Sequence, residues 1–242
     1  MHIFITGGTR GIGKGLVIEF LKAGHNVSFT GTSELSLSKA ISSLEGNFNG
    51  IVCDVRMKNN ILDAMAKAIK KYNKIDIWVN NAGVNQDNLT ITDLSEENIK
   101  NVIDINVSGM ILATSVALTQ MKKQGFGKVY NMEGLGSNNM KIPKTIVYGS
   151  SKRLLTYFSQ ACNKELKEYD NIFVGTLSPG MVFTDFIKGS IDEEDNKITK
   201  VLANKVEVVT PFLVKKMLKG KKRIVWLTNL KIMWRFLTIW LR

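Results

Sequence analysis

A tyrosine and a lysine stand four residues apart in Tyr148-Gly149-Ser150-Ser151-Lys152, at the start of a stretch with apolar residues at helical spacing. Side chains four residues apart lie on one face of a helix. A lysine cation near a phenol favours the phenolate, so this tyrosine can exchange a proton closer to neutral pH. Reduction of a carbonyl needs such a proton donor beside the oxygen while hydride reaches the carbon. Because the pair also occurs by chance on solvated helix faces, its interpretation depends on whether the chain binds a hydride carrier.

A glycine-rich turn near the N-terminus predicts where such a carrier binds. Residues 3–6 predict a short apolar strand, Gly7, Gly11 and Gly13 form the turn, and a helix with one apolar side follows. Glycines allow a tight turn and a close approach to a pyrophosphate, and a helix N-terminus favours negative charge. The spacing Gly-x-x-x-Gly-x-Gly differs from the general Gly-x-Gly-x-x-Gly fingerprint. Its place directly after the first strand favours a dinucleotide site over a turn without a ligand.

The end of the second predicted strand, residues 27–30, indicates which dinucleotide binds. An acidic residue there would hold the ribose 2′-hydroxyl of NAD, but the nearest one is Glu34. Arg10, Thr32 and Ser33 instead offer a cation and hydroxyl groups suited to a 2′-phosphate. We therefore expect NADP(H) rather than NAD(H). The alternative is that Arg10 simply points to water.

Further predicted strands at residues 51–55, 75–79, 128–132, 172–177 and 223–227 alternate with predicted helices at residues 58–72, 96–123, 148–169 and 206–218. This alternation predicts an α/β fold, a single-domain Rossmann-type doubly wound parallel β-sheet flanked by helices. We expect an NADP-binding domain over residues 1–229, with a substrate loop at about 183–205, and a basic aromatic tail over residues 230–242.

Polar residues follow several predicted strands, at the edge where open parallel sheets bind ligands. Asp54 and Asn81 both fall there, although Asp54 can equally be a turn residue. Asn106 lies inside an apolar helical segment, where an asparagine is costly unless it is hydrogen-bonded. Asn106 is therefore either a satisfied structural residue or part of the site.

Composition limits the classes of function. The 242 residues carry a net charge of +12, which favours anionic ligands, membrane surfaces or nucleic acid. Two histidines and two cysteines without metal-like spacing argue against a metal site, a Ser-His-Asp triad or a disulfide-dependent secreted protein. Because the first strand begins at Ile3, we expect no signal or transit peptide, and no uncharged apolar run reaches the length of a membrane span. We expect a cytoplasmic protein without nucleic-acid partners.

Four motifs occur in one order: Thr6-Gly7-x-x-x-Gly11-x-Gly13, Asn80-Asn81-Ala82-Gly83, Tyr148-x-x-x-Lys152, and Pro179-Gly180 with Thr184. Together they resemble the short-chain dehydrogenase/reductase family over nearly the whole chain. The resemblance implies an NADP-dependent oxidoreductase that reduces an aldehyde or ketone to an alcohol, or catalyses the reverse. It also leads us to expect a small-molecule substrate and a homodimer or homotetramer.

The resemblance also implies roles for individual residues. Tyr148 matches the proton donor, Lys152 the residue that binds the ribose and lowers the tyrosine pKa, and Asn106 the residue that holds a relay water. Asp54 matches a residue beside the adenine, and Asn81 one that steadies the central strand. We expect the cofactor to contact Gly7, Thr9, Arg10, Gly11, Ile12, Gly13, Thr32, Ser33, Asp54, Val55, Asn81, Ala82, Gly83, Tyr148, Lys152, Pro179, Gly180, Val182 and Thr184.

One position departs from the family pattern. The family usually has a catalytic serine thirteen residues before the tyrosine, and this chain has Leu135 there. Ser137 is the nearest hydroxyl, and we name it as the fourth candidate catalytic residue. The alternative is that Ser137 is a loop residue and the usual serine is missing. That alternative keeps a rival function open: a non-catalytic NADP-binding regulatory or scaffold protein on the same fold.

Three segments, residues 131–137, 147–152 and 226–231, resemble the chlorophyll(ide) b reductase branch of the family. Members of that branch reduce a formyl group on a tetrapyrrole to a hydroxymethyl group with NADPH. The resemblance suggests a bulky, apolar substrate, although bacterial relatives with the same loop need not act on chlorophyll.

Residues 230–242 form a basic, aromatic end to the chain. One interpretation is a helix at a membrane surface, with tryptophans at the headgroups and cations on anionic lipid. A second is a wall or lid of the substrate pocket. The third is packing against another subunit or the core, which would cover an apolar patch of this size.

Overall fold

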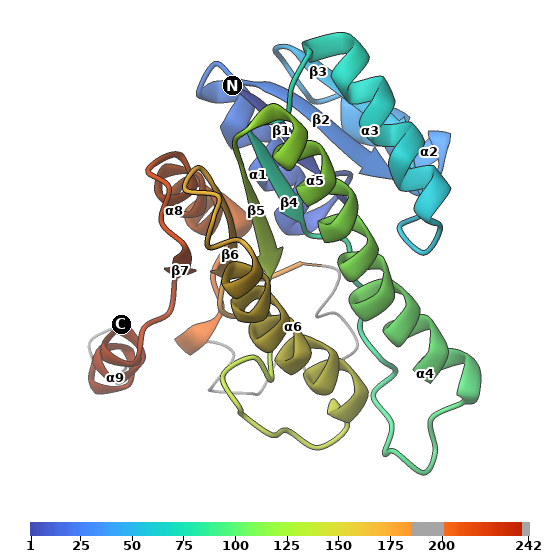
Figure 1. The fold of residues 1–242 in the computed structure, drawn as a ribbon. Coiled ribbons are helices and arrows are strands. Elements are labelled where there is room, and N and C mark those ends of the chain that lie inside the picture. The colour runs from blue at the N-terminus through green and yellow to red at the C-terminus, as the bar shows by residue number, and fades with distance from the viewer. Residues whose placement is uncertain (185–200, 239–242) are drawn as a thin grey trace.

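The computed structural model describes residues 1–184 and 201–238, and its strands form one seven-stranded parallel sheet in the order β3-β2-β1-β4-β5-β6-β7 (Figure 1). The elements are β1 (His2–Ile5), α1 (Gly11–Lys22), β2 (Asn26–Gly31), α2 (Glu34–Ile41), β3 (Phe48–Val52), α3 (Lys58–Tyr72), β4 (Ile77–Asn80), α4 (Glu96–Ile103), η1 (Asp104–Gly109), α5 (Met110–Gln124), β5 (Gly127–Met132), α6 (Ile146–Glu165), β6 (Ile172–Ser178), α8 (Val206–Leu218), β7 (Arg223–Val225) and α9 (Asn229–Leu237). The strand order reverses between β1 and β4, so the sheet is doubly wound, as the sequence predicts.

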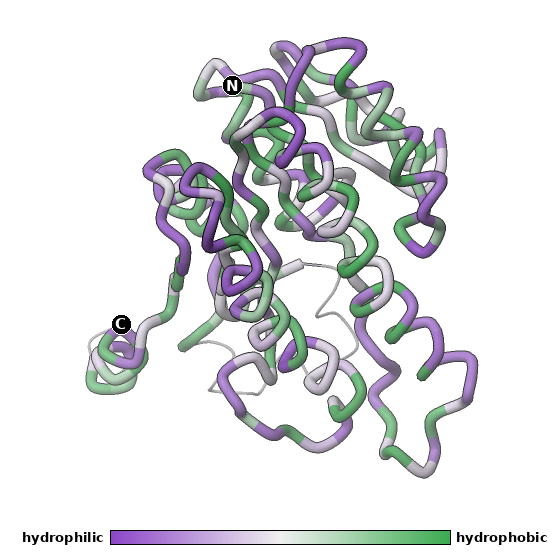
Figure 2. The backbone as a smooth tube through the Cα atoms, viewed as in Figure 1, coloured by the Kyte–Doolittle hydropathy of each residue, from purple (hydrophilic) through white to green (hydrophobic). Residues whose placement is uncertain are grey.

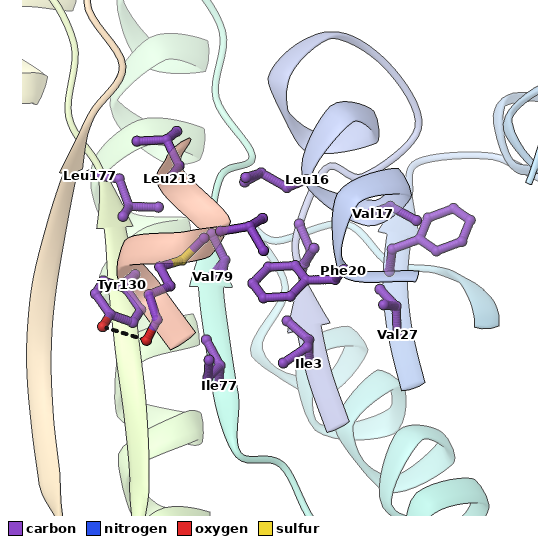
Figure 3. Close-up of a cluster of buried hydrophobic side chains, with 14 of the residues drawn as sticks. Ile3, Leu16, Val17, Phe20, Val27, Ile77, Val79, Tyr130, Leu177 and Leu213 are labelled. Carbon is purple, nitrogen blue, oxygen red and sulfur yellow. Dashed lines mark hydrogen bonds between the residues drawn. The ribbon is translucent and has the colours of Figure 1, made fainter. Parts of the chain in front are cut away.

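Helices cover both faces of the sheet. Ile3 and Ile5 of β1 join the cluster under α1 and α8, whereas Phe4 between them joins the cluster under α3 and α5. Figure 3 shows the first of these clusters. Strands buried on both faces must be apolar almost throughout, which is why the short runs of isoleucine, valine and phenylalanine in the sequence mark the strands so clearly.

The predicted helix at residues 96–123 is a continuous helical run, but its middle is a wide π turn, η1 (Asp104–Gly109). By length and composition this run, Glu96–Gln124, could cross a membrane. Its Ala113, Val116 and Met121 pack into the cluster beneath the sheet, as the core helix of a globular domain does. Wide turns of this kind often occur at functional sites.

A buried polar network joins the centre of the sheet to two helices. The Asn80 side chain donates to Thr114 Oγ1 on α5 at 2.9 Å and to Asn131 Oδ1 on β5 at 2.8 Å. Asn131 donates in turn to Ser159 Oγ on α6 at 2.9 Å. Because buried amides need every partner they have, this network sets the position of α6 against β5.

Some predicted boundaries are wrong. β3 spans Phe48–Val52 rather than residues 51–55, because Val27 of β2 pairs with Phe48 and Gly31 pairs with Val52. Asp54 therefore lies beyond the strand. Helix α6 ends at Glu165 rather than near Tyr169. Most of the expected substrate loop, residues 185–200, and residues 239–242 of the tail lie outside the described residues.

Candidate active site

The glycine turn after β1 forms a cradle at the carboxyl edge of the sheet. Gly7 has a φ of 65°, and a Cβ on it would lie 2.9 Å from the Ala82 Cα atom. A Cβ on Gly13 would lie 2.1 Å from the Gly7 carbonyl oxygen and 2.5 Å from the Asn81 side chain. Backbone contacts this close exclude any side chain, so the sequence must have glycine at both positions.

Asn81 and Thr6 fix this turn to the end of β4. The Asn81 amide nitrogen donates to the carbonyl oxygens of Thr6 and Gly7 at 3.1 and 2.8 Å. The Thr6 hydroxyl accepts from the backbone of Asn81 and of Ala82 at 3.0 and 3.1 Å. Asn81 thus steadies the central strand, as expected, and Thr6 is a partner that the sequence analysis did not identify.

The N-terminus of α1 opens into the cradle. Arg10 occupies the cap position without a side-chain hydrogen bond to the helix, and the first turn holds no acidic residue. The first backbone N–H groups of a helix lack helical acceptors and attract anions. Because Gly7 and Gly13 also leave room for close approach, the residues present fit the pyrophosphate of a dinucleotide.

Residues after β6 form the opposite side of this cradle. A Cβ on Gly11 would lie 3.4 Å from the Thr184 methyl group, so these two segments are close neighbours. Gly180 has a φ of 70°, and Leu227 packs against it. Val182 pairs with Asn204 in a short parallel bridge and is buried. The structure therefore brings Thr184 to the glycine turn, as the motif spacing suggests.

The expected ribose and adenine residues are only partly assembled. Arg10 and Thr32 are exposed near the ends of β1 and β2, but the Ser33 hydroxyl caps α2 by accepting from Ser36. Asp54 pairs with Arg56 at 2.6 Å, and the hydrogen bonds from Arg56 lower the pKa of its carboxyl. Val55 is buried against Gly109 of the π turn. The Asp54–Arg56 pair was not identified from the sequence.

Asn106 lies in the π turn and points inward. Its Oδ1 accepts from Val84 N at 2.8 Å, and its Nδ2 donates to Val84 O at 2.8 Å and to Ser151 Oγ at 3.2 Å. A Cβ on Gly83 would lie 3.1 Å from Asn106 Oδ1 and 3.6 Å from Lys152 Nζ. Asn106 and Lys152 therefore meet at Gly83, on the edge of the cradle.

Tyr148 and Lys152 lie one turn apart on α6, and both are buried. The Lys152 ammonium donates to the Met132 carbonyl oxygen at 3.2 Å and lies 5.7 Å from the centre of the Tyr148 ring. The expectation that lysine lowers the tyrosine pKa differs from what burial does in the structure. Burial raises the pKa of Tyr148 and lowers the pKa of Lys152 to about 8, because loss of water disfavours both charged forms.

The loop after β5 packs directly on this pair. A Cβ on Gly134 would lie 2.3 Å from the Tyr148 hydroxyl, and one on Gly136 would lie 2.5 Å from the Gly149 carbonyl oxygen. The Ser137 hydroxyl donates to the Lys152 carbonyl oxygen at 3.0 Å and accepts from Gly134 N at 3.2 Å. The structure thus gives Ser137 a role in joining the loop to α6.

Two buried polar side chains near this pair were missed by the sequence analysis. Gln86 accepts a hydrogen bond from the Tyr148 backbone, and Glu133 accepts one from Thr156 at 3.4 Å. The available signal was a polar residue three positions after the Asn-Asn-Ala-Gly motif for Gln86, and one directly after β5 for Glu133. The contacts themselves join residues far apart in the sequence, so the pattern could not predict them.

A family model described as short chain dehydrogenase matches residues 1–195, which is most of the chain and includes all four motifs. This match decides the family.

The chain belongs to the short-chain dehydrogenase family.

Its relatives within the family include the chlorophyll(ide) b reductases of plants. The chain is 34% identical over 223 residues to a chlorophyll(ide) b reductase of Oryza sativa subsp. japonica, covering 88% of this chain and 65% of the relative. It is 32% identical over 265 residues to a probable chlorophyll(ide) b reductase of Arabidopsis thaliana, covering 100% of this chain and 53% of the relative. The chain thus spans about half to two thirds of the length of these relatives, and the resemblance to this branch is confirmed.

Solved structures of short-chain dehydrogenases have the same fold. The closed form of a serine dehydrogenase with NADP+ is 25% identical, with a TM-score of 0.80 over 93% of this chain and 95% of that one. A 3-ketoacyl-(acyl-carrier-protein) reductase from Brucella melitensis with NADH is 20% identical, with a TM-score of 0.80 over 90% of this chain and 88% of that one. The chain therefore has the fold of these dehydrogenases, two of which hold NADP+ or NADH in their solved structures.

One expectation is corrected by these relatives. We expected a cytoplasmic protein, but the four plant chlorophyll(ide) b reductases that match this chain are chloroplast proteins, which points away from the cytoplasm. The composition of the chain held no signal for this difference, because charge and hydropathy of a folded domain do not report its compartment.

Proposed function

We propose that this chain reduces an aldehyde or ketone to an alcohol with NADPH, or catalyses the reverse, with Tyr148 as the proton donor. The observation that carries the proposal is the placement of three side chains beside the cradle. Lys152 Nζ and Asn106 Oδ1 both approach Gly83, and Tyr148 lies one helical turn from Lys152. A general acid must lie next to the oxygen that it protonates.

The charges in the site suit the direction of reduction. Burial raises the pKa of Tyr148, so the phenol keeps its proton at neutral pH. The pKa of Lys152 is lowered to about 8, so at pH 7 its ammonium is still mostly charged. When bound, NADPH supplies the hydride. As negative charge develops on the carbonyl oxygen, Tyr148 donates its proton, and the Lys152 cation stabilises the phenolate that remains.

We further propose that the cofactor is NADPH rather than NADH. The support is the exposed cation of Arg10 at the start of α1, near the end of β2, where Thr32 is also exposed. Ser33 supports this less than the sequence suggested, because its hydroxyl caps α2. The Arg10→Ala variant should raise the KM for NADPH about tenfold, as expected for the loss of one charge-assisted hydrogen bond, and leave the KM for NADH unchanged. An equal effect on both cofactors would contradict the proposal.

The substrate that we propose is a large, mainly apolar carbonyl compound, with a formyl-bearing tetrapyrrole as the leading candidate. The loop that carries Gln86 contacts the start of α6 where Tyr148 N donates to Gln86. Exposed apolar side chains lie in this loop, in the loop before α6 and on the first residue of α6, and they are Leu89, Ile91, Met140, Ile142 and Ile146. Exposed apolar groups gathered beside a polar site are typical of a surface for an apolar ligand. The formyl group itself comes from the names of the plant relatives.

NADPH consumption tests the proposed function. We expect the wild-type protein to oxidise NADPH in the presence of chlorophyllide b or of simple aldehydes, with the alcohol found by mass spectrometry. When 4-deuterated NADPH is used, the alcohol should gain one deuterium. NADPH binding without turnover of any carbonyl in the panel would instead support the rival function, a regulatory or scaffold protein.

A second surface supports a contact with membranes. Thr228 caps α9, and Arg235 holds the helix to the chain before α8 through Val201, Leu202 and Asn204. The remaining face carries exposed apolar side chains, which are Leu230, Met233, Trp234, Phe236 and Leu237. The end of α8, the turn after it and the start of β7 are basic, with Lys215, Lys216, Lys219, Lys221, Lys222 and Arg223. We propose that this face lies on an anionic lipid surface.

Liposome sedimentation tests the membrane contact. The full chain should pellet with vesicles that contain anionic phosphatidylglycerol and stay in solution with neutral phosphatidylcholine. Deletion of residues 230–242 should abolish pelleting, and unchanged pelleting would contradict the proposal. The deletion also tests whether α9 packs against a second copy of the chain. If light scattering shows a dimer for the full chain and a monomer after the deletion, α9 contacts a second copy rather than a membrane. The expected homodimer or homotetramer stays a prediction.

A further inference from the structure

Gln86 caps the helix that carries the candidate catalytic pair. Tyr148 is the third residue of α6, where a backbone N–H has no acceptor within the helix. Thr145, at the cap position, makes no side-chain hydrogen bond to the helix. The Tyr148 N–H instead donates to Gln86 Oε1 at 3.0 Å, from a residue 62 positions earlier. Gln86 therefore helps to fix the backbone of Tyr148.

The other half of the Gln86 amide is unpaired. Gln86 is only 6% exposed, and its Nε2 has no hydrogen-bond partner among residues 1–184 and 201–238. The orientation of the amide is fixed, because the N–H of Tyr148 requires an oxygen opposite it. Buried N–H groups are almost always paired, so an unpaired one beside a candidate site indicates an acceptor on a ligand.

Among the described residues of the loop after β5, neither Leu135 nor Ser137 offers a free hydroxyl to a substrate oxygen. Leu135 has no hydroxyl, and Ser137 uses its hydroxyl on the backbone of Lys152 and of Gly134. The loop that carries Gln86 is held against the site, since Asn106 forms two hydrogen bonds with the Val84 backbone. Gln86 is thus anchored both to the cradle side of the site and to α6.

We propose that Gln86 Nε2 donates a hydrogen bond to an oxygen of the bound substrate, a carbonyl or carboxylate oxygen. This inference rests on the proposed carbonyl reduction and adds to it a residue that binds and positions the substrate. Gln86 then has two functions: its Oε1 accepts a hydrogen bond from the N-terminus of α6, and its Nε2 donates one to the substrate. The two functions can be separated by substitution because they use different atoms.

The test compares Gln86→Glu with Gln86→Leu, using chlorophyllide b and benzaldehyde as probes. Gln86→Glu keeps an acceptor for the Tyr148 N–H, and a carboxylate is favourable at a helix N-terminus, but it loses the donor. We expect its KM for the carbonyl probe to rise about tenfold, as for one lost hydrogen bond, with the KM for NADPH and the Tm unchanged. Gln86→Leu loses both functions, so its Tm should also fall.

Gln160→Glu is the matched control, because it adds the same charge at an exposed position of the same helix. It should leave all parameters unchanged. A Gln86→Glu variant with the wild-type KM for both probes overturns the assignment, because Nε2 would then face only a buried water. The proposed function fails separately: a wild-type protein that turns over neither probe overturns both proposals, whereas normal turnover by wild type and Gln86→Glu alike overturns only the role of Gln86.

Discussion

Substitution of Gly134 by alanine tests how closely the loop after β5 controls the Tyr148 hydroxyl. A Cβ on Gly134 would lie 2.3 Å from that hydroxyl, whereas ordinary contacts begin at 3.4 Å. The backbone of Gly134 has no positive φ, so alanine itself adds no backbone strain. The cost falls on Tyr148, whose phenol must move away from the loop or force the loop to move.

The size of the effect follows from these distances. The hydroxyl oxygen must shift by about 1 Å to regain ordinary contact, and a misplacement of ~1 Å can reduce turnover by ~100-fold. That factor corresponds to about 2.7 kcal/mol in the activation barrier. We expect kcat for carbonyl reduction to fall by about this factor, while the Kd for NADPH, measured by fluorescence, stays within about twofold.

Gly149→Ala is the matched control because it lies next to Tyr148 on α6. The nearest atoms to a Cβ there are 3.9 Å away, so the methyl group fits, and alanine should stabilise the helix by about 0.5–1 kcal/mol. Its kcat should match the wild type. If Gly134→Ala is folded and as active as Gly149→Ala, then the position of the Tyr148 hydroxyl does not limit turnover, and the reasoning is refuted.

Four further outcomes are expected. Burial lowers the pKa of Lys152 to about 8, so kcat/KM should fall as pH rises through that value. The Lys152→Met variant should show a low rate that does not depend on pH. A wild-type kcat/KM that stays constant from pH 7 to about 9 would contradict this expectation. The unfolded chain keeps that proton up to a pKa of 10.5, so Lys152 should make the free energy of unfolding rise with pH between about 8 and 10.5. The Asn106→Leu variant leaves the backbone N–H and C=O of Val84 without their side-chain partner. We expect the free energy of unfolding, measured with urea, to fall by about 3 kcal/mol. An unchanged urea midpoint would show that the π turn does not depend on these bonds. Ser137→Ala should lower the urea midpoint by releasing the loop from Lys152 and reduce kcat less than tenfold, whereas a loss near that of a Tyr148 variant would restore Ser137 to the catalytic residues.

The sequence predicts the fold well because its signals are local. Runs of apolar residues such as Ile3–Ile5 mark strands buried on both faces, and Gly7 and Gly13 mark a turn where backbone atoms meet. The wide π turn around Asn106 is not visible in the pattern, since its residues keep the apolar spacing of an ordinary helix. The misplaced start of β3 has a similar cause, because register depends on pairing with β2 rather than on the strand's own residues.

The sequence predicts which residues form the candidate site better than it predicts the hydrogen bonds between them. Lys152 and Asn106 meet at Gly83, whereas the Tyr148 hydroxyl lies against Gly134 in the loop after β5. Ser137 was the nearest hydroxyl in sequence, yet its partner is the carbonyl oxygen of Lys152 across the loop. The link between Gln86 and Tyr148 joins the loop after β4 to α6 through one amide. Such contacts depend on side-chain directions in the folded chain, which the spacing of residues does not determine.

The hydroxyl of Tyr148 is the centre of the proposed chemistry, and its removal tests that proposal most directly. Tyr148→Phe deletes one oxygen, and Tyr157→Phe deletes the same oxygen at an exposed position on the same helix. Single-turnover oxidation of NADPH by chlorophyllide b or benzaldehyde should be lost in the first variant and normal in the second, with equal Kd values for NADPH. Turnover by Tyr148→Phe at the rate of Tyr157→Phe would contradict the assignment of Tyr148 as the proton donor.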